Sequence, residues 1–149
     1  MEIIMDFKPV TAKNFHECIN LKIKDEQEGF CASNLYSIAE SKVEPLAIPL
    51  CIYVNNIMVG FILYGPEETD KGMIMSIDRF MMDQRFQGKG YGKLALIKLI
   101  ELIKNNYEFK EVYLSYEPEN IIADKLYCNY GFIKTGEFCG NECIAKLKL

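Results

Sequence analysis

Apolar residues recur along this chain with two different periods, and each change of period marks a new predicted element. Between residues 46 and 82 the apolar positions form three β-rich runs, at 46–54, 57–65 and 73–82. The pair Asn55-Asn56 separates the first two runs, and asparagine tolerates the positive φ angles of a tight hairpin turn. We therefore predict a hairpin, a polar loop over 65–72, and a third long strand.

Elsewhere, apolar residues spaced three and four apart predict four helices, at about 14–24, 34–43, 91–105 and 120–130. Asn14 and Glu17 have the spacing of a capping box for the first helix. In the second helix, Leu35, Ile38, Ala39 and Val43 form the predicted apolar face. Shorter strands are expected at 3–7, ending before Pro9, and at 111–116, 133–138 and 143–149. The chain of 149 residues fits one compact α/β domain spanning 1–149.

Strand 73–82 carries two ionisable residues at its centre. Strict alternation would place Ser76, Asp78 and Phe80 on one face and Arg79 on the other. Two interpretations stay open. Asp78 and Arg79 either lie at a bulge where they are solvated or paired, or they belong to a functional site.

The segment after this strand has the form of an anion-binding loop. It reads Arg85-x-x-Gly88-x-Gly90-x-Gly92 and leads directly into a strongly apolar helix. The first turn of a helix has unpaired N–H groups and the positive end of the helix dipole, so it favours phosphate. Lys93-Leu94 does not match a Walker loop, and position 93 is not the third glycine of a dinucleotide fingerprint. A flexible loop before an ordinary helix is the alternative.

Composition excludes several other classes of function. The net charge is −4 without an extended basic cluster, which argues against nucleic acid and anionic membranes as partners. No apolar run approaches the roughly 20 residues that span a bilayer, and the N-terminus lacks the basic start of a signal peptide. We therefore expect a cytoplasmic protein. The six cysteines include no C-x-x-C and His16 is the single histidine, so no metal is expected.

Two linked motifs resemble the GCN5-related N-acetyltransferase (GNAT) family. The first is the glycine loop from Arg85 to Gly92. The second is an Asn-x-x-Ala-x-x-Leu-Tyr-x-x-x-Gly-Phe segment, which this chain matches at Asn120, Ala123, Leu126, Tyr127, Gly131 and Phe132. The resemblance implies a GNAT fold, with a mixed, mostly antiparallel sheet of about six to seven strands flanked by about four helices.

The resemblance also implies acetyl-CoA as the co-substrate. The backbone near Phe80, Met81 and Met82 would pair with the pantetheine arm, and the segment from Gln87 to Lys93 would hold the pyrophosphate. Asn120 has a helix-capping role as well as a cofactor role. The cofactor-binding set is therefore Phe80, Met81, Met82, Gln87, Gly88, Lys89, Gly90, Tyr91, Gly92, Lys93 and Asn120.

In the resembled family, Tyr127 stands where a phenol acts as general acid beside the cofactor sulfur. A tyrosine packed on the sheet is the alternative. An alkylammonium with a pKa near 10 must lose a proton before it attacks, so a carboxylate or a water chain is needed. The candidates for this base are Asp78, Glu28, Glu40 and Glu117, and their spacing does not choose among them.

A second resemblance, to the spermine/spermidine acetyltransferases of Gram-positive bacteria, rests on residues 34–40, 79–93, 114–120 and 135–137. It implies a small-molecule polyamine as substrate, and a homodimer is left open. An acidic lining of Glu26, Glu28, Glu40 and Asp78 would attract such a cation, although acidic surfaces are equally often just solvated. Glu28, Glu40 and Asp78 are the expected substrate-binding residues. Two alternatives remain: the same fold acting on an aminoglycoside, an amino acid or a protein N-terminus, or a non-catalytic acyl-CoA-binding module.

Overall fold

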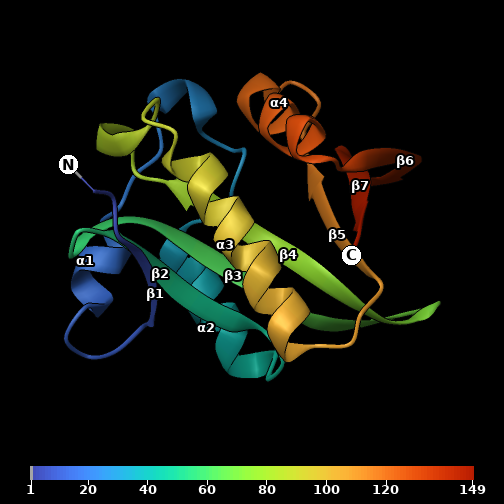
Figure 1. The fold of residues 1–149 in the computed structure, drawn as a ribbon, viewed down its shortest axis with the longest axis horizontal. Coiled ribbons are helices and arrows are strands. Elements are labelled where there is room, and N and C mark those ends of the chain that lie inside the picture. Colours follow the sequence, from blue (N-terminus) through green and yellow to red (C-terminus); the bar gives the residue numbers. More distant parts are fainter. Residues whose placement is uncertain (1) are drawn as a thin grey trace.

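A computed structural model describes residues 2–149, which form a single seven-stranded sheet with helices on both faces (Figure 1). The strands are β1 (Met5–Pro9), β2 (Ile48–Val54), β3 (Ile57–Thr69), β4 (Gly72–Met82), β5 (Glu111–Tyr116), β6 (Ile133–Cys139) and β7 (Glu142–Lys148). The helices are α1 (Phe15–Ile19), α2 (Asn34–Val43), α3 (Tyr91–Asn106) and α4 (Ile121–Tyr130), with 3₁₀ turns η1 (Asp25–Gln27) and η2 (Gln84–Phe86).

The strand order is β1-β2-β3-β4-β5-β7-β6, and within residues 2–149 the pairing is antiparallel except between β4 and β5. The predicted mixed, mostly antiparallel sheet is confirmed. Asn55 and Asn56 adopt φ angles of 49° and 68°, as expected for the turn between β2 and β3. The helix α3 supplies the crossover that a parallel pair requires.

The two parallel strands stay together for only three residue pairs, from Met75–Val112 to Ile77–Leu114. Beyond Ile77, β4 continues to Met82 while pairing only with β3, and β5 turns away (Figure 1). On the β3 side, Arg79 pairs with Leu63 and Ile77 pairs with Tyr64, so Asp78 is the extra residue of a β-bulge. The sheet therefore opens into a V at this bulge.

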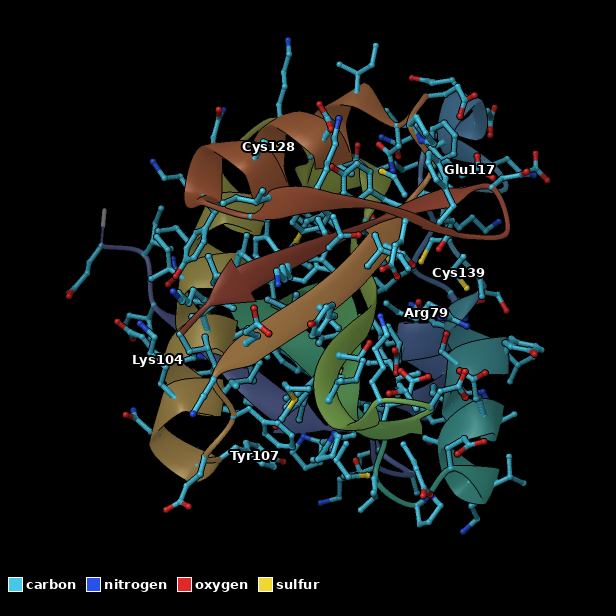
Figure 2. The ribbon with its side chains drawn as sticks, turned by 90° about the vertical axis from the view of Figure 1, so that its right-hand side faces the viewer. Arg79, Lys104, Tyr107, Glu117, Cys128 and Cys139 are labelled. Carbon is cyan, nitrogen blue, oxygen red and sulfur yellow. The ribbon has the colours of Figure 1, made fainter. Side chains whose placement is uncertain are left out.

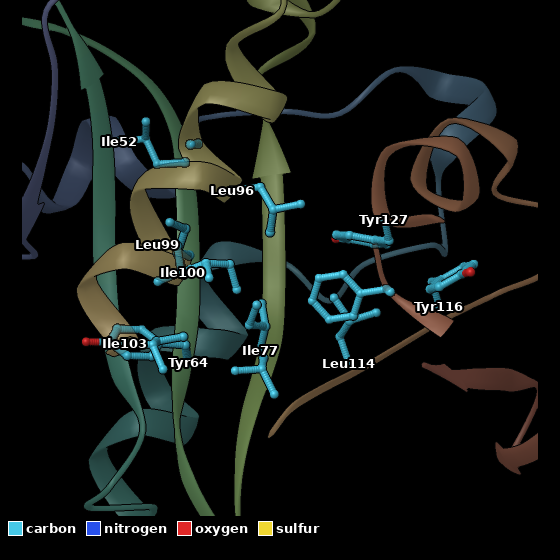
Figure 3. Close-up of a cluster of buried hydrophobic side chains, with 14 of the residues drawn as sticks. Ile52, Tyr64, Ile77, Leu96, Leu99, Ile100, Ile103, Leu114, Tyr116 and Tyr127 are labelled. Atoms are coloured by element: carbon cyan, nitrogen blue, oxygen red, sulfur yellow. The ribbon is translucent and has the colours of Figure 1, made fainter. Parts of the chain in front are cut away.

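Two apolar clusters hold the helices on opposite faces of the sheet. On one face, α3 buries Leu96, Leu99, Ile100 and Ile103 against Ile52, Ile62 and Ile77 (Figure 3). On the other face, Cys18 of α1 and the following Leu21 pack with Phe61, Leu63 and Met81. Each fully buried Leu or Ile contributes about 1.5–3 kcal/mol, so α3 is held firmly on the strands that define the V.

Several predicted boundaries were wrong, and local hydrogen bonding explains them. The first strand runs from Met5 to Pro9 and does not end before the proline, which β-edges tolerate. The first helix ends at Ile19, and the Asn14 side chain accepts from the Thr11 N–H instead of capping it. The predicted loop 65–72 is largely strand, because β3 and β4 stay paired as far as Thr69 and Gly72.

Two predicted faces were also wrong. In α2 the buried residues are Asn34 and Ser37, while Leu35 and Val43 are 52% and 76% exposed. Asn34 is buried because its Nδ2 donates to the Cys18 carbonyl at 2.9 Å. In β4 the bulge shifts the alternation by one residue, so Met75, Ile77 and Met82 share the α3 face while Met81 lies on the α1 face.

In the described part of the chain, no helix is long and apolar enough to cross a membrane. Over the same residues, no three His, Cys, Asp or Glu side chains are grouped to hold a metal ion.

Candidate active site

A cleft of about 1670 Å³ lies in the opening between β4 and β5. Its walls come from residues 76–82 of β4, the segment after η1, the glycine loop, α4 and the β6–β7 hairpin. A typical small-ligand pocket has about 300–1,000 Å³. This cleft is therefore large enough for an extended cofactor and a second substrate together.

The glycine loop forms the end of the cleft at the N-terminus of α3. Gly88 and Gly90 have φ angles of 79° and 82°, a conformation that side chains rarely adopt. A Cβ placed on either glycine would meet no protein atom within 4 Å, so the space beside them belongs to the cleft. The helix begins at Tyr91, and its first unpaired N–H groups follow directly. The loop thus has the local structure of a phosphate site.

Asp83 anchors this loop to the rest of the molecule. Its carboxylate is buried and accepts from the Lys22 N–H at 2.9 Å, the Arg85 N–H at 3.0 Å and Arg85 Nε at 2.7 Å. Burial by itself would raise the pKa of Asp83, but the hydrogen bonds from Arg85 and Lys22 bring that pKa below its ordinary value. The carboxylate is therefore ionised and fixes the position of the loop.

Tyr127 of α4 faces the cleft from the opposite side to β4. Its ring lies beside that of Tyr116, at a centroid distance of 5.4 Å (Figure 3). The centroid distances to two further aromatic rings are 5.8 Å for Phe132 and 6.3 Å for Phe80. Its hydroxyl makes no hydrogen bond with any of residues 2–149. Burial, reinforced by the nearby Cys31 thiol, raises the pKa of Tyr127 above its ordinary value. The phenol stays protonated and is available as a proton donor.

The start of α4 is fixed by Asn120, whose Oδ1 accepts from the Ala123 N–H at 3.2 Å. The capping role predicted for Asn120 is confirmed, and the residue also lines the cleft. Tyr116 of β5 donates to Asp124 of α4 at 2.8 Å, and Lys134 pairs with the same carboxylate. These bonds hold α4, and with it Tyr127, against the splayed strand.

Arg79 lies on β4 on the side that faces α2 (Figure 2). Its Nη2 is 3.4 Å from Glu40 Oε1, and its Nη1 donates to the Asp78 carbonyl at 2.8 Å. Glu40 therefore neutralises Arg79, and the Asp78 carboxylate is left without a direct ion pair among the described residues. Arg79 Nε is buried with no partner in the same part of the chain.

Asp78 forms an acidic group with Ser76 and Glu67. The Ser76 hydroxyl donates to Asp78 Oδ1 at 2.8 Å and also contacts the Glu67 carboxylate of β3. Burial raises the pKa of Asp78, the neighbouring Glu40 and Glu44 add to the rise, and the Ser76 hydroxyl and Arg79 oppose it. Burial and the Asp78 charge likewise raise the pKa of Glu67. Ser76 is thus next to both carboxylates, and the Asp78 charge raises the pKa of Glu67.

Most residues predicted from the sequence meet in this cleft. Its lining includes Asp78, Phe80, Met81, Met82, Gln87, Gly88, Gly90, Tyr91, Gly92, Asn120 and Tyr127. The remaining candidates, which are Glu26, Glu28, Glu40, Lys89, Lys93 and Glu117, do not line it. Glu28 is exposed on the segment between η1 and α2, and Glu40 points to Arg79.

Sequence reasoning missed Gln27, Cys31, Ser76 and Glu67, all of which line the cleft. Glu67 falls within the predicted polar loop over 65–72, which is largely strand in the structure. The continuation of β3 past Gly65 could be recognised only from its pairing with β4. Gln27 carried no signal, since its partner is 60 residues away.

The comparisons with known proteins agree with this geometry. Residues 15–132 match the model of the acetyltransferase (GNAT) family. The chain belongs to the GNAT acetyltransferase family.

Curated relatives and solved structures extend this assignment. The chain is 34% identical over 148 residues to a spermine/spermidine N(1)-acetyltransferase of Bacillus subtilis strain 168, covering 95% of this chain and 97% of the relative. A probable spermine N(1)-acetyltransferase of Bacillus subtilis subsp. natto is 33% identical with the same coverage. The fold resembles the PaiA N-acetyltransferase of Thermoplasma acidophilum in complex with coenzyme A, with a TM-score of 0.71 and 16% identity over 98% of this chain and 99% of that one.

The protein is therefore an N-acetyltransferase that uses acetyl-CoA as co-substrate. The residues present fit this ligand. The open space beside Gly88 and Gly90 suits a pyrophosphate at the N-terminus of α3, and the unpaired edge of β4 beyond Ile77 suits an extended arm that binds as an extra strand.

Replacing Gly90 by valine should remove acetyl-CoA binding. The new side chain would fill the open side of the loop and would have to adopt a positive φ, a strain of about 1–3 kcal/mol. We expect the calorimetric Kd for acetyl-CoA to rise at least about a hundredfold, since the ligand loses the space as well as the loop conformation. Gly140→Val, at φ 59° in the β6–β7 turn, is the matched control and should bind acetyl-CoA normally. An unchanged Kd in folded Gly90→Val would refute the loop assignment.

Asp83 should make stability depend on pH in a defined direction. Because its folded pKa lies below the unfolded value, its stabilisation is present above about pH 4 and is lost as the pH falls through the folded pKa. Asp83→Asn should lower the free energy of unfolding at pH 7 by about 2 kcal/mol, a typical cost for losing charged hydrogen bonds.

Urea unfolding at pH 7 and pH 3 measures this difference, which should shrink at the lower pH. The exposed Asp70→Asn is the control and should change stability little at either pH. A difference that stays constant between the two pH values would show that the Asp83 charge is not responsible.

Proposed function

We propose that this enzyme acetylates a primary amine of a polyamine such as spermidine or spermine. The observation that carries the proposal is the acidic group on the β3–β4 side of the cleft, where Asp78 and Glu67 share Ser76. The two Bacillus relatives, whose names specify spermine or spermidine, support the same substrate class.

Asp78 is the proposed acceptor of the ammonium proton. It lines the cleft at the bulge, and its pKa is raised by burial, which makes it a stronger base than an exposed aspartate. Glu40 holds Arg79, so the guanidinium does not form an ion pair with the Asp78 carboxylate. The neutral amine can then attack the acetyl carbonyl, with Asp78 taking the proton directly or through one water.

Tyr127 is the proposed proton donor to the departing thiolate. Its pKa is raised, its hydroxyl is unpaired within residues 2–149, and its ring lies 6.3 Å from Phe80 on the strand proposed to hold the pantetheine arm. In this scheme a base on β4 and an acid on α4 act from the two sides of the V.

The acidic group also favours a second positive charge on the substrate. Glu67 lies on β3 beyond Ser76, so it can pair with an ammonium some distance from the reacting nitrogen while Asp78 acts at that nitrogen. Glu28, which is exposed between η1 and α2, stays a predicted substrate residue, and Glu40 contributes through Arg79. An aminoglycoside, an amino acid or a protein N-terminus is the alternative acceptor, and a panel of amines distinguishes them.

Removing the Tyr127 hydroxyl should affect turnover and not cofactor binding. We expect Tyr127→Phe to lower kcat about 10²-fold, as for the loss of a general acid, with the acetyl-CoA Kd unchanged within about twofold. Steady-state kinetics and calorimetry measure the two quantities. Tyr130→Phe, also on α4 but outside the cleft lining, is the control. Near-normal turnover in Tyr127→Phe would make this residue a packing residue.

Glu67→Gln should weaken selection for polyamines. We expect kcat/KM for spermine and spermidine to fall about fivefold to tenfold, mainly through KM, with little change for a monoamine of similar length. Added salt should reduce the same preference by screening. Glu68→Gln removes an equal charge from a neighbouring residue that does not line the cleft, and it should have no such effect. Equal use of monoamines and polyamines by the unmodified enzyme would reject the polyamine proposal and leave the acetyltransferase activity standing.

A further inference from the structure

The side chains of Gln27 and Gln87 form a reciprocal amide pair across the mouth of the cleft. Gln27 Nε2 donates to Gln87 Oε1 at 3.0 Å, and Gln87 Nε2 donates back to Gln27 Oε1 at 2.9 Å. Both residues are half-buried, and they come from segments 60 residues apart. One belongs to η1 and the other opens the glycine loop.

Each amide is also bound to backbone, which fixes its orientation. Gln87 Nε2 uses its second hydrogen for the Met82 carbonyl at 3.0 Å. Gln27 Oε1 accepts a second bond from the Lys24 N–H at 3.0 Å. A carboxylate at position 27 could accept these bonds but could not donate to Gln87 Oε1, so only an amide satisfies the whole set.

Asp83 supports the start of the loop at Arg85, and the Gln27–Gln87 pair supports the loop beyond that point. Gly88 and Gly90 have no side chain to anchor the loop. The exposed Lys89 side chain makes no hydrogen bond or ion pair within the described chain, and α3 begins only at Tyr91. Gln87 is therefore the last side-chain anchor before the helix. The partner segment forms one wall of the cleft. It begins at Lys24 and Gln27 and continues through Gly29, Phe30 and Cys31 toward the part of the cleft proposed to hold the amine.

A second connection lies beside the first but is of another kind. Lys22 is bound through its backbone, by its N–H to Asp83 and by its carbonyl, which accepts from the Gln84 N–H at 2.7 Å. These bonds bring the two segments together at one end. They do not involve the stretch from Lys24 to Ala32, whose contact with the glycine loop is made through Gln27.

We propose that Gln27 is a positioning residue for acetyl-CoA, and that the Gln27–Gln87 pair couples cofactor binding to the acceptor wall formed by residues 24–32. The pair holds the Gln87 peptide in the conformation that presents the loop N–H groups to the pyrophosphate. Because linkage is reciprocal, a ligand that fixes the loop also fixes this wall. Acetyl-CoA binding then prepares the site for the amine.

The test uses the whole enzyme with acetyl-CoA and no amine, so its outcome does not depend on the proposed polyamine substrate. Gln27→Ala should raise the calorimetric Kd for acetyl-CoA about tenfold. In hydrogen exchange, acetyl-CoA should slow the amides of residues 24–32 in the native enzyme and should leave them unchanged in Gln27→Ala.

Four further variants separate positioning from general stability. Gln87→Ala should match Gln27→Ala, and the double variant should lose no more than either single one, because both remove the same pair. Gln27→Glu, which keeps the acceptor, should also weaken binding. Gln84→Ala is the matched control, since its side chain is exposed and hydrogen-bonds to nothing in residues 2–149. An unchanged Kd in Gln27→Ala or Gln27→Glu, additive losses in the double variant, or cofactor protection of residues 24–32 without Gln27 would each overturn the proposal.

Discussion

The separation of β4 from β5 after Ile77 is the constraint on which the rest of the site depends. If β5 stayed paired with β4 as far as Met82, it would hydrogen-bond the backbone groups along that edge of β4. No room would then be left for a ligand. The bulge at Asp78 changes the direction of the side chains at the point where the strands part. It turns the acidic residue to the cleft and returns Met82 to the core under α3. The extra residue, Asp78, thus lies where the cleft opens and places a carboxylate at the edge of the cleft.

Burial and charge divide this opening into two chemically different sides. On the α4 side, aromatic rings surround Tyr127 and keep its phenol protonated. On the α2 side, Glu40 pairs with Arg79, and burial raises the pKa values of Asp78 and Glu67. The proposed mechanism assigns the proton donor to the first side and the proton acceptor to the second, as acyl transfer to an amine requires. The arrangement depends on partners from α2 and β3 as much as on the residues that line the cleft.

The sequence predicted the parts of this site that depend on local chemistry. The glycine spacing at 88 and 90, the Asn55-Asn56 turn and the Asn120 cap each follow from what a residue type can do with its own neighbouring backbone. The sequence leaves a bulge at Asp78 as one of two interpretations, and the pairing with β3 confirms it. The buried Asn34 was out of reach, because its burial depends on the Cys18 carbonyl. The apolar face predicted for α2 was wrong for the same reason. Helix periodicity shows which residues share a face, but the hydrogen bond from Asn34 to the Cys18 carbonyl accounts for the face that is buried.

Long-range amide and carboxylate contacts also explain why the glycine loop can be open and yet ordered. A loop with two positive-φ glycines has high conformational freedom in isolation, so its bound conformation must be held by its flanks. The helix α3 holds one flank through buried Leu and Ile side chains. The other flank has no such core and is held instead by Asp83, whose three accepted bonds reach Lys22 and Arg85. Polar anchoring on this flank leaves the glycines accessible, whereas an apolar anchor would cover them. It also joins the glycine loop to the segment that begins at Lys22.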